Sequence, residues 1–155
     1  MPAVTQRNTL CYFHDMPRVP KAYLPARIAA DALRRLDRHA KLLGKPRSNL
    51  VERYVEEGLR MDEHAGIVFV EGPAGRRPAL RRGPDIWEVI NALHANDGDV
   101  GDTAEVLNLP ESEVRIALGY YADNKSEIDD WLRANDEEFD RIVAATKRQG
   151  KAARR

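Results

Sequence analysis

The stretch KAYLPARIAADALRRLDRHAKLLGKPRSNLVERYVEEGL, residues 21–59, decides how this chain is organised. An alternating segment opens it, and two amphipathic helical patterns follow, with the basic turn Gly44-Lys45-Pro46-Arg47-Ser48 between them. A segment of about forty residues is too short to bury a core by itself. Its apolar faces therefore predict a second copy of the chain as the packing partner, and we expect a homodimer.

The alternating segment has the period of a half-buried strand. One face carries Leu24, Ala26 and Ile28, and the other carries Tyr23, Pro25 and Arg27. The first helical stripe is formed by Ala29, Leu33, Leu36, Ala40 and Leu43. Gly44 is placed to end that helix in a left-handed cap, and Ser48 to cap the next one. The second helix is expected to bury Leu50, Val51, Tyr54, Val55 and Leu59.

The rest of the chain predicts a small hairpin and then helices. The apolar run Ile67–Val70 and the segment Arg77–Leu80 flank Gly72-Pro73-Ala74-Gly75, which is typical of a hairpin. Helices are predicted from Asp85, over Asp102–Leu107, from Pro110, where Val114, Ala117, Leu118 and Tyr121 should be buried, and from a capping box at Ser126. The last helix carries Ile128, Trp131, Leu132, Asn135, Phe139, Ile142 and Val143 along one side.

These patterns divide the chain into five parts and predict a mainly α protein. They are an irregular arm (1–20), a strand–helix–helix unit (21–61), a hairpin or linker (62–84), an acidic helical domain (85–146) and a basic disordered tail (147–155).

The net charge of zero hides a strong segregation of charge. Residues 21–60 hold ten Lys and Arg against five Asp and Glu, whereas residues 85–140 hold three against sixteen. Residues 141–155 hold six cations and no acid. This pattern indicates a polyanion as partner at one end and a basic molecule at the other, with charge balancing within the molecule as the alternative.

Several classes of function lack support in the sequence. No apolar run is long enough to span a bilayer, and residues 1–7 lack a signal core, so a cytoplasmic protein is expected. The lone Cys11 and histidines at positions 14, 39, 64 and 94 show no metal-ligand spacing. Without a catalytic motif, we expect neither an enzyme nor a cofactor.

The run Leu24-Pro-Ala-Arg-Ile-Ala-Ala-Asp-Ala-Leu33, with its following helices, resembles the ribbon-helix-helix family of the Arc, MetJ and CopG type. The resemblance covers residues 21–60 and implies that two chains pair their strands into a ribbon that enters the DNA major groove. Pro25, which lacks an N–H, and Ala29, in place of the usual helix-opening proline, depart from the pattern. An ordinary helical hairpin packed on the rest of the chain is the alternative.

The resemblance implies which residues contact DNA. The outward strand residues would face base edges, and Arg27 is the strongest candidate because a guanidinium can bond both acceptors of a guanine. The start of the second helix would present backbone N–H groups to a phosphate, with charged side chains beside it. The predicted DNA-binding residues are Tyr23, Pro25, Arg27, Lys45, Arg47, Ser48 and Asn49.

The acidic half contains a second pattern, residues 100–115, that is typical of a helix-turn-helix. Glu111 and Glu113 in the first turn of its second helix would repel phosphates, so it is interpreted as a scaffold for binding protein. The segment from Val114 to Asp129, and most specifically Ala117–Asn124, is similar to the bacterial domain-of-unknown-function family 433. Members of that family often look like antitoxins encoded beside PIN-type ribonuclease toxins.

The predicted partner-binding residues are Tyr120, Trp131, Phe139 and Ile142. An aromatic stripe flanked by acids suits the groove of a basic partner, and packing across the dimer is the alternative. Together these observations predict a homodimeric antitoxin and autorepressor in a bacterial cytoplasm. It would bind operator DNA and neutralise a basic toxin, of the PIN ribonuclease type. A stand-alone regulator whose acidic half only dimerises or senses a ligand is the second hypothesis.

Overall fold

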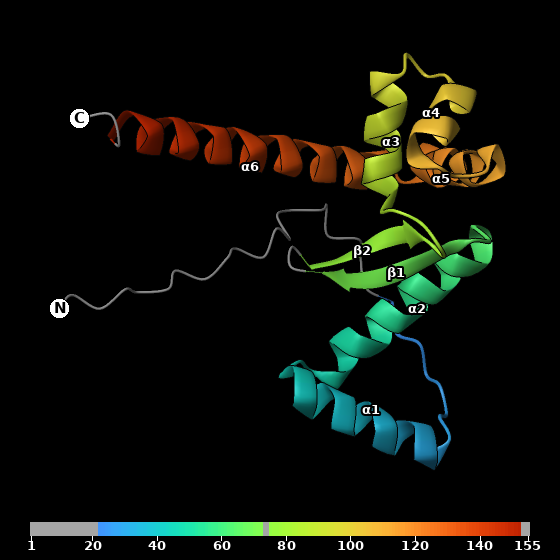
Figure 1. Cartoon of the computed structure of the whole chain (residues 1–155). Coiled ribbons are helices and arrows are strands. Elements are labelled where there is room, and N and C mark those ends of the chain that lie inside the picture. The colour runs from blue at the N-terminus through green and yellow to red at the C-terminus, as the bar shows by residue number, and fades with distance from the viewer. Residues whose placement is uncertain (1–21, 73–74, 153–155) are drawn as a thin grey trace. The chain divides into compact units, whose positions relative to one another are not determined.

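The computed structural model describes residues 22–72 and 75–152, and the predicted arm, residues 1–20, lies outside them (Figure 1). The described chain is mainly helical with one two-stranded antiparallel hairpin, as predicted. It divides into two compact units, one ending at Glu52 and the other beginning at Arg53. The elements are α1 (Ala30–Leu43), α2 (Arg47–Glu63), β1 (Ile67–Gly72), β2 (Gly75–Leu80), α3 (Ile86–Ala95), α4 (Val100–Leu107), α5 (Glu111–Asp123) and α6 (Lys125–Ala152).

Local chemistry sets the ends of the helices in the first unit. Gly44 adopts φ 61°, and its N–H donates to the carbonyls of Ala40 and Lys41, so the predicted left-handed cap of α1 is confirmed. The prediction that Ser48 caps α2 is wrong, because the helix begins at Arg47. The carbonyl of Pro46 accepts the N–H of Leu50 at 3.3 Å, and proline needs no N–H partner there.

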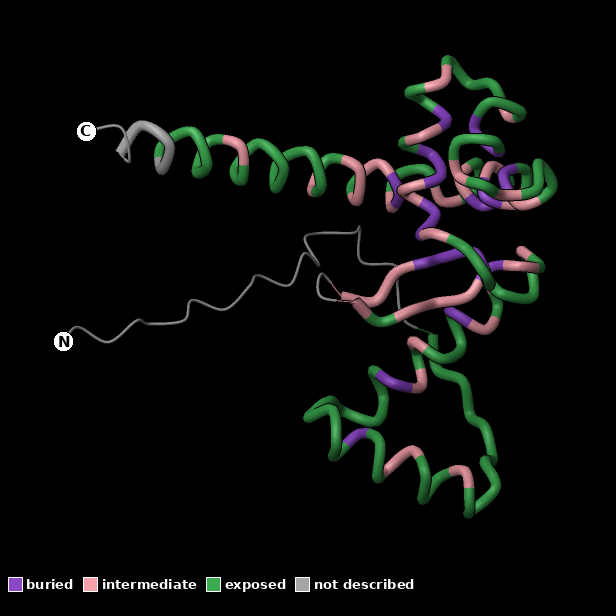
Figure 2. Tube along the Cα trace, in the orientation of Figure 1, coloured by how far each residue is buried: buried purple, intermediate pink, exposed green. Residues whose placement is uncertain are grey.

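Most described residues of the first unit are exposed, and most of its apolar residues are among them (Figure 2). Among residues 22–52 only Ala40 and Leu50 are buried. Residues 22–29 form neither helix nor strand in the single chain, and Leu24 is 78% exposed. On the predicted buried face of α2, Leu50 is buried and Val51 is partly buried, whereas the other members are exposed. These exposed members are Tyr54, Val55 and Leu59.

The second unit holds the hydrophobic core. The hairpin pairs Ile67 with Leu80 at its base and Gly72 with Gly75 at its tip. Helices α3, α4, α5 and the start of α6 pack together beside it, as Figure 1 shows. Core residues from these elements include Ile67, Leu80, Ile86, Val89, Ile90, Leu93, Ala104, Val114, Ala117, Tyr120 and Ile128. Their burial stabilises this unit by removing apolar surface from water.

Two predicted details of this unit are wrong. Helix α4 begins at Val100, before the predicted Asp102, because the Asp99 side chain accepts the N–H of Asp102 at 2.9 Å and caps the helix. Of the two adjacent tyrosines in α5, Tyr120 is the buried one, and Tyr121 is only partly buried.

Helix α6 begins earlier and ends later than predicted. The carbonyl of Asn124 accepts the N–H of Ile128 at 3.3 Å, so Ser126 lies inside the helix and the predicted capping box is wrong. The predicted disordered tail, residues 147–155, is helical through Ala152. No proline interrupts residues 125–152, and the cations at the end of the helix suit its dipole.

The exposure of α6 changes along its length. Ile128 is fully buried and Leu132 packs against the core, whereas residues 135–142 are exposed (Figure 2). The second half of α6 therefore extends away from the core of its own unit, as Figure 1 shows. No helix in the described part of the chain is long and apolar enough to cross a membrane.

Candidate functional site

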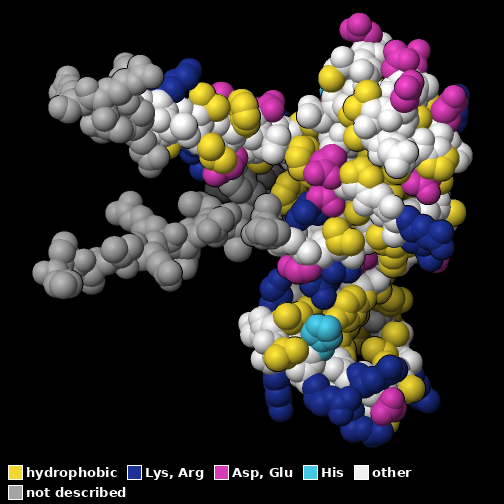
Figure 3. Space-filling view, in the orientation of Figure 1, with side chains coloured by type: hydrophobic (Ala, Val, Ile, Leu, Met, Phe, Trp, Pro, Cys, Tyr) yellow, Lys and Arg dark blue, Asp and Glu magenta, His cyan; other side chains and the backbone are white. Residues whose placement is uncertain are grey.

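All seven predicted DNA-binding residues are exposed in the first unit. Tyr23 is 92% exposed, and Pro25 and Arg27 lie in the same extended run of exposed residues. Lys45 and Arg47 flank the start of α2. Lys and Arg side chains gather over α1 in the face drawn in Figure 3. The unit therefore combines a basic surface with uncovered apolar side chains.

An open hollow of about 430 Å³ lies between the end of α1 and the start of α2. It is lined by Asp37, Ala40, Lys41, Lys45 and Arg47. Arg47 Nη1 lies 3.1 Å from Asp37 Oδ1, and both side chains remain about half exposed. No acid occupies the first turn of α2, so its free N–H groups and the nearby cations can attract an anion such as a phosphate.

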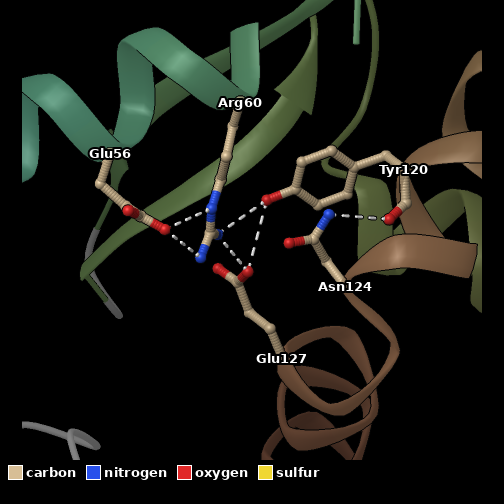
Figure 4. A network of polar contacts seen from close by, with 5 residues as sticks. All are labelled: Glu56, Arg60, Tyr120, Asn124 and Glu127. Atoms are coloured by element: carbon tan, nitrogen blue, oxygen red, sulfur yellow. Dashed lines mark hydrogen bonds and ion pairs between the residues drawn. The ribbon is translucent and has the colours of Figure 1, made fainter. Parts of the chain in front are cut away.

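The second unit contains a partly buried polar network centred on Arg60 (Figure 4). Arg60 Nη1 donates to Glu127 Oε2 at 2.6 Å and to the hydroxyl of Tyr120 at 3.1 Å. Arg60 Nε donates to Glu56 Oε1 at 3.1 Å, and the Tyr120 hydroxyl lies 3.3 Å from Glu127 Oε2. Asn124 donates to the carbonyl of Tyr120 at 3.0 Å. The network joins the end of α2 to α5 and α6.

Burial and neighbouring charges raise the pKa of two groups in this network, Arg60 and Tyr120. Burial acts to lower the pKa of Arg60, but the charge of Glu127 and the hydrogen bond with Tyr120 outweigh it, so that the pKa is raised. Burial raises the pKa of Tyr120 as well, and the charge of Glu127 adds to that effect. The guanidinium therefore stays charged and the phenol stays protonated near neutral pH, which suits a structural role for this pair.

Tyr121 takes part in a separate, more exposed cluster where α5 ends and α6 begins. Its hydroxyl donates to Asp129 Oδ1 at 2.8 Å and accepts from Lys125 Nζ at 2.6 Å. Lys125 also pairs with Asp129 at 2.8 Å, and the ring of His94 from α3 meets the Tyr121 ring edge-on. The two tyrosines of Ala117–Asn124 are thus each bonded to a carboxylate of α6, and together they fix where α6 leaves α5.

Two arginines of the hairpin, which sequence reasoning missed, neutralise buried carboxylates. Arg76 donates twice to Glu57 of α2, at 2.5 and 2.8 Å, and this hydrogen bonding raises the pKa of Arg76. Arg77 pairs with Asp85, which precedes α3 and also accepts from Trp87 Nε1 at 3.3 Å. The adjacent arginines on β2 are a sequence signal that carboxylates pack against this strand.

The predicted partner-binding residues do not form one surface. Tyr120 has no exposed area, so its assignment as a partner contact is wrong in this conformation, because its hydroxyl is taken up by the Arg60 network. Trp131 is partly buried. Phe139 and Ile142 lie three residues apart on α6 and are 64% and 56% exposed. These two residues remain as the exposed apolar side chains of the predicted stripe.

A hollow of about 360 Å³ near the Arg60 network is lined by Glu56, Leu59, Arg60, Glu63, His64, Asp123 and Asn124. His64 Nε2 lies 3.5 Å from Asp123 Oδ2. Within residues 22–72 and 75–152, no group of three or more His, Cys, Asp or Glu side chains is arranged to hold a metal ion. The charged residues that line this hollow contact one another, as Arg60 and Glu56 do.

No protein-family model matches this chain, and searches of curated proteins and of solved structures find no significantly similar protein.

Proposed function

We propose that this protein is a dimeric, DNA-binding antitoxin that represses its own operon and neutralises a basic toxin, of the PIN ribonuclease type. The observation that carries the proposal is the combination found in the first unit. Leu24 is 78% and Ile28 is 49% exposed, in the same run as Arg27. Apolar side chains left bare beside a basic surface favour a second copy on one face and a polyanion on the other.

The DNA-binding part of the proposal follows the geometry of a two-stranded ribbon. Two copies of residues 23–28 can pair antiparallel, which would cover the Leu24 and Ile28 side chains and leave Arg27 on the outer face. A two-stranded ribbon fits the major groove, where an arginine reads guanine. The hollow beside Lys45 and Arg47 would take a backbone phosphate at the start of α2.

The toxin-binding part of the proposal follows the charge of the second unit. Among the charged side chains on the face of α3 to α5 drawn in Figure 3, most are Asp and Glu. On α5, Arg115 is paired with Glu111 at 2.9 Å, so little positive charge offsets the acids there. Such a surface repels nucleic acid and attracts a basic protein. A nuclease whose groove is basic, because it binds RNA, has the required chemistry.

Binding of DNA and dimerisation are tested together on the purified chain. We expect a dimer in sedimentation velocity at micromolar concentration, and binding to a fragment of its own promoter that weakens steeply with salt. A monomer that binds no duplex DNA at low salt would contradict the proposal.

Neutralisation is tested by expressing the neighbouring reading frame with and without this protein. Toxicity that is relieved by co-expression supports the antitoxin. A harmless neighbour, together with DNA binding, identifies the chain as a stand-alone regulator whose acidic half serves dimerisation or ligand sensing.

A further inference from the structure

One face of α6 keeps a regular spacing well beyond the core. Ile128 and Leu132, which pack inside the unit, begin a repeat with alternating steps of four and three residues. The repeat continues through Asn135, Phe139, Ile142 and Thr146, all of which are exposed. A seven-residue repeat of this kind keeps one seam of a helix facing a second helix. The exposed half of α6 therefore has the pattern of a helix that is packed on another.

The charges of α6 change sign in the middle of that exposed seam. Residues 126–140 carry seven acids and one arginine, whereas residues 141–152 carry four cations and no acid. The change falls between Asp140 and Arg141, which lie between Phe139 and Ile142. A partner protein with a uniformly basic groove would be repelled by the cations in the last turns of α6. A helix with the same two blocks in the opposite direction places its basic end along the acidic block and its acidic end along the basic block.

We propose that the second half of α6 pairs antiparallel with the same segment of a second copy of this chain. The twofold axis passes between residues 140 and 141. It places Phe139 against Ile142 of the other copy, and Asn135 against Thr146. This isologous arrangement sets acidic blocks opposite basic ones. A parallel pair would instead place like charges side by side.

The polar layers give the pairing its register. Asn135 and Thr146 flank the two apolar layers, and a polar side chain in a helical seam penalises shifted pairings. The pairing goes beyond the proposed function because it covers Phe139 and Ile142 when no toxin is bound. It does not require the first unit to dimerise, although a dimer there would raise the effective concentration of the two helices. A toxin that binds this part of α6 would have to separate them.

Disulfide trapping between two different single-cysteine variants tests the pairing. In a full-length Cys11→Ser background, Glu138→Cys and Ala145→Cys place thiols on one flank of the seam. In the antiparallel pair these positions meet across the axis. Two copies of the same variant hold their thiols farther apart along the helices, by about 7 Å for Glu138→Cys and about 13 Å for Ala145→Cys. We expect the mixture of variants to form the mixed disulfide about ten times faster than the control below.

The matched control uses Glu137→Cys mixed with Ala144→Cys, positions that have the same separation along α6 but lie on its outer face. Adding Phe139→Ser to both members of the first pair should remove the mixed disulfide while leaving the helix content unchanged. A mixed disulfide no faster than the control, or disulfides mainly between identical variants, would overturn the proposal. Dimerisation through the first unit is measured separately, by sedimentation of the Cys11→Ser protein that also carries Phe139→Ser and so lacks the α6 pairing.

Discussion

Arg60 in α2 and Glu127 in α6 form an ion pair with 2.6 Å between Nη1 and Oε2, although they lie 67 residues apart in the sequence. Tyr120 closes the arrangement, since its hydroxyl lies within hydrogen-bonding distance of both side chains. Each charged side chain is only about one-fifth exposed. The pair therefore fixes the end of α2 on the start of the helix that leaves the core.

Replacing Arg60 with Met should destabilise the second unit by about 2–3 kcal/mol. Glu127 and Tyr120 would lose their common hydrogen-bond partner, and little solvent reaches them to replace it. Urea unfolding followed by circular dichroism measures the change. Arg115→Met is the matched control. Its pair with Glu111 is more than half exposed, so we expect a change of less than about 0.5 kcal/mol. Equal effects of the two substitutions would show that the Arg60 network contributes nothing special.

The surface cluster around Tyr121 predicts a dependence of stability on pH. Hydrogen bonds from Lys125 and then Tyr121 lower the pKa of Asp129 below its ordinary value of 3.8. A carboxylate with a lowered pKa in the folded state stabilises the protein above its unfolded pKa, and this contribution is lost as pH falls through the folded pKa.

Asp129→Asn should therefore be less stable than the parent protein at neutral pH, and the difference should shrink below about pH 4. Urea midpoints measured across that range give the difference. Asp130→Asn, which removes a charge from the exposed side of the same turn, is the control. A difference between parent and Asp129→Asn that is independent of pH would contradict the assignment.

The helices and the hairpin could be predicted because their signals are local. The alternation of Ile67–Val70, the glycines around the turn and the 3.6-residue periods each act within a few residues. The left-handed cap at Gly44 is of the same kind. The helix starts at Ser48 and Ser126 were displaced because the preceding carbonyls, of Pro46 and Asn124, accept the first helical N–H groups. A serine near a helix start fits several registers, and the backbone selects one.

The roles of the two tyrosines could not be predicted because distant residues decide them. Tyr120 and Tyr121 are adjacent in α5, and a rotation of the helix by one residue would exchange the buried tyrosine for the partly buried one. Arg60, sixty residues earlier in the chain, fixes Tyr120 inside. The same holds for Arg76 and Arg77, whose acidic partners lie in other elements. Sequence periodicity carries no information on such pairs.

Alanine substitutions at two glycines, one at the end of α1 and one within α2, should have opposite effects on stability. A Cβ added at Gly58, in the interior of α2, meets nothing within 4 Å, so Gly58→Ala should stabilise the protein by about 1 kcal/mol through helix propensity. Gly44 also has open space, but its φ of +61° strains any other residue. Gly44→Ala should therefore destabilise by about 1 kcal/mol. Chemical unfolding of both variants gives the two signs, and a destabilising Gly58→Ala would show that another surface packs closely on α2.

The two classes of predicted DNA contact should separate in binding measurements. Arg27→Ala should weaken binding to the operator by about 1–3 kcal/mol and relax specificity at one base position, because a base contact is lost.

Lys45→Ala should weaken binding evenly across sequences and reduce the slope of log affinity against log salt by about 1, because a phosphate contact is lost. Fluorescence anisotropy with operator and scrambled duplexes at several salt concentrations measures both quantities. Arg115→Met in the acidic half serves as the control for removing one cation. If Arg27→Ala weakens binding to operator and scrambled DNA equally, then Arg27 contacts the backbone, and the ribbon does not present it to the bases.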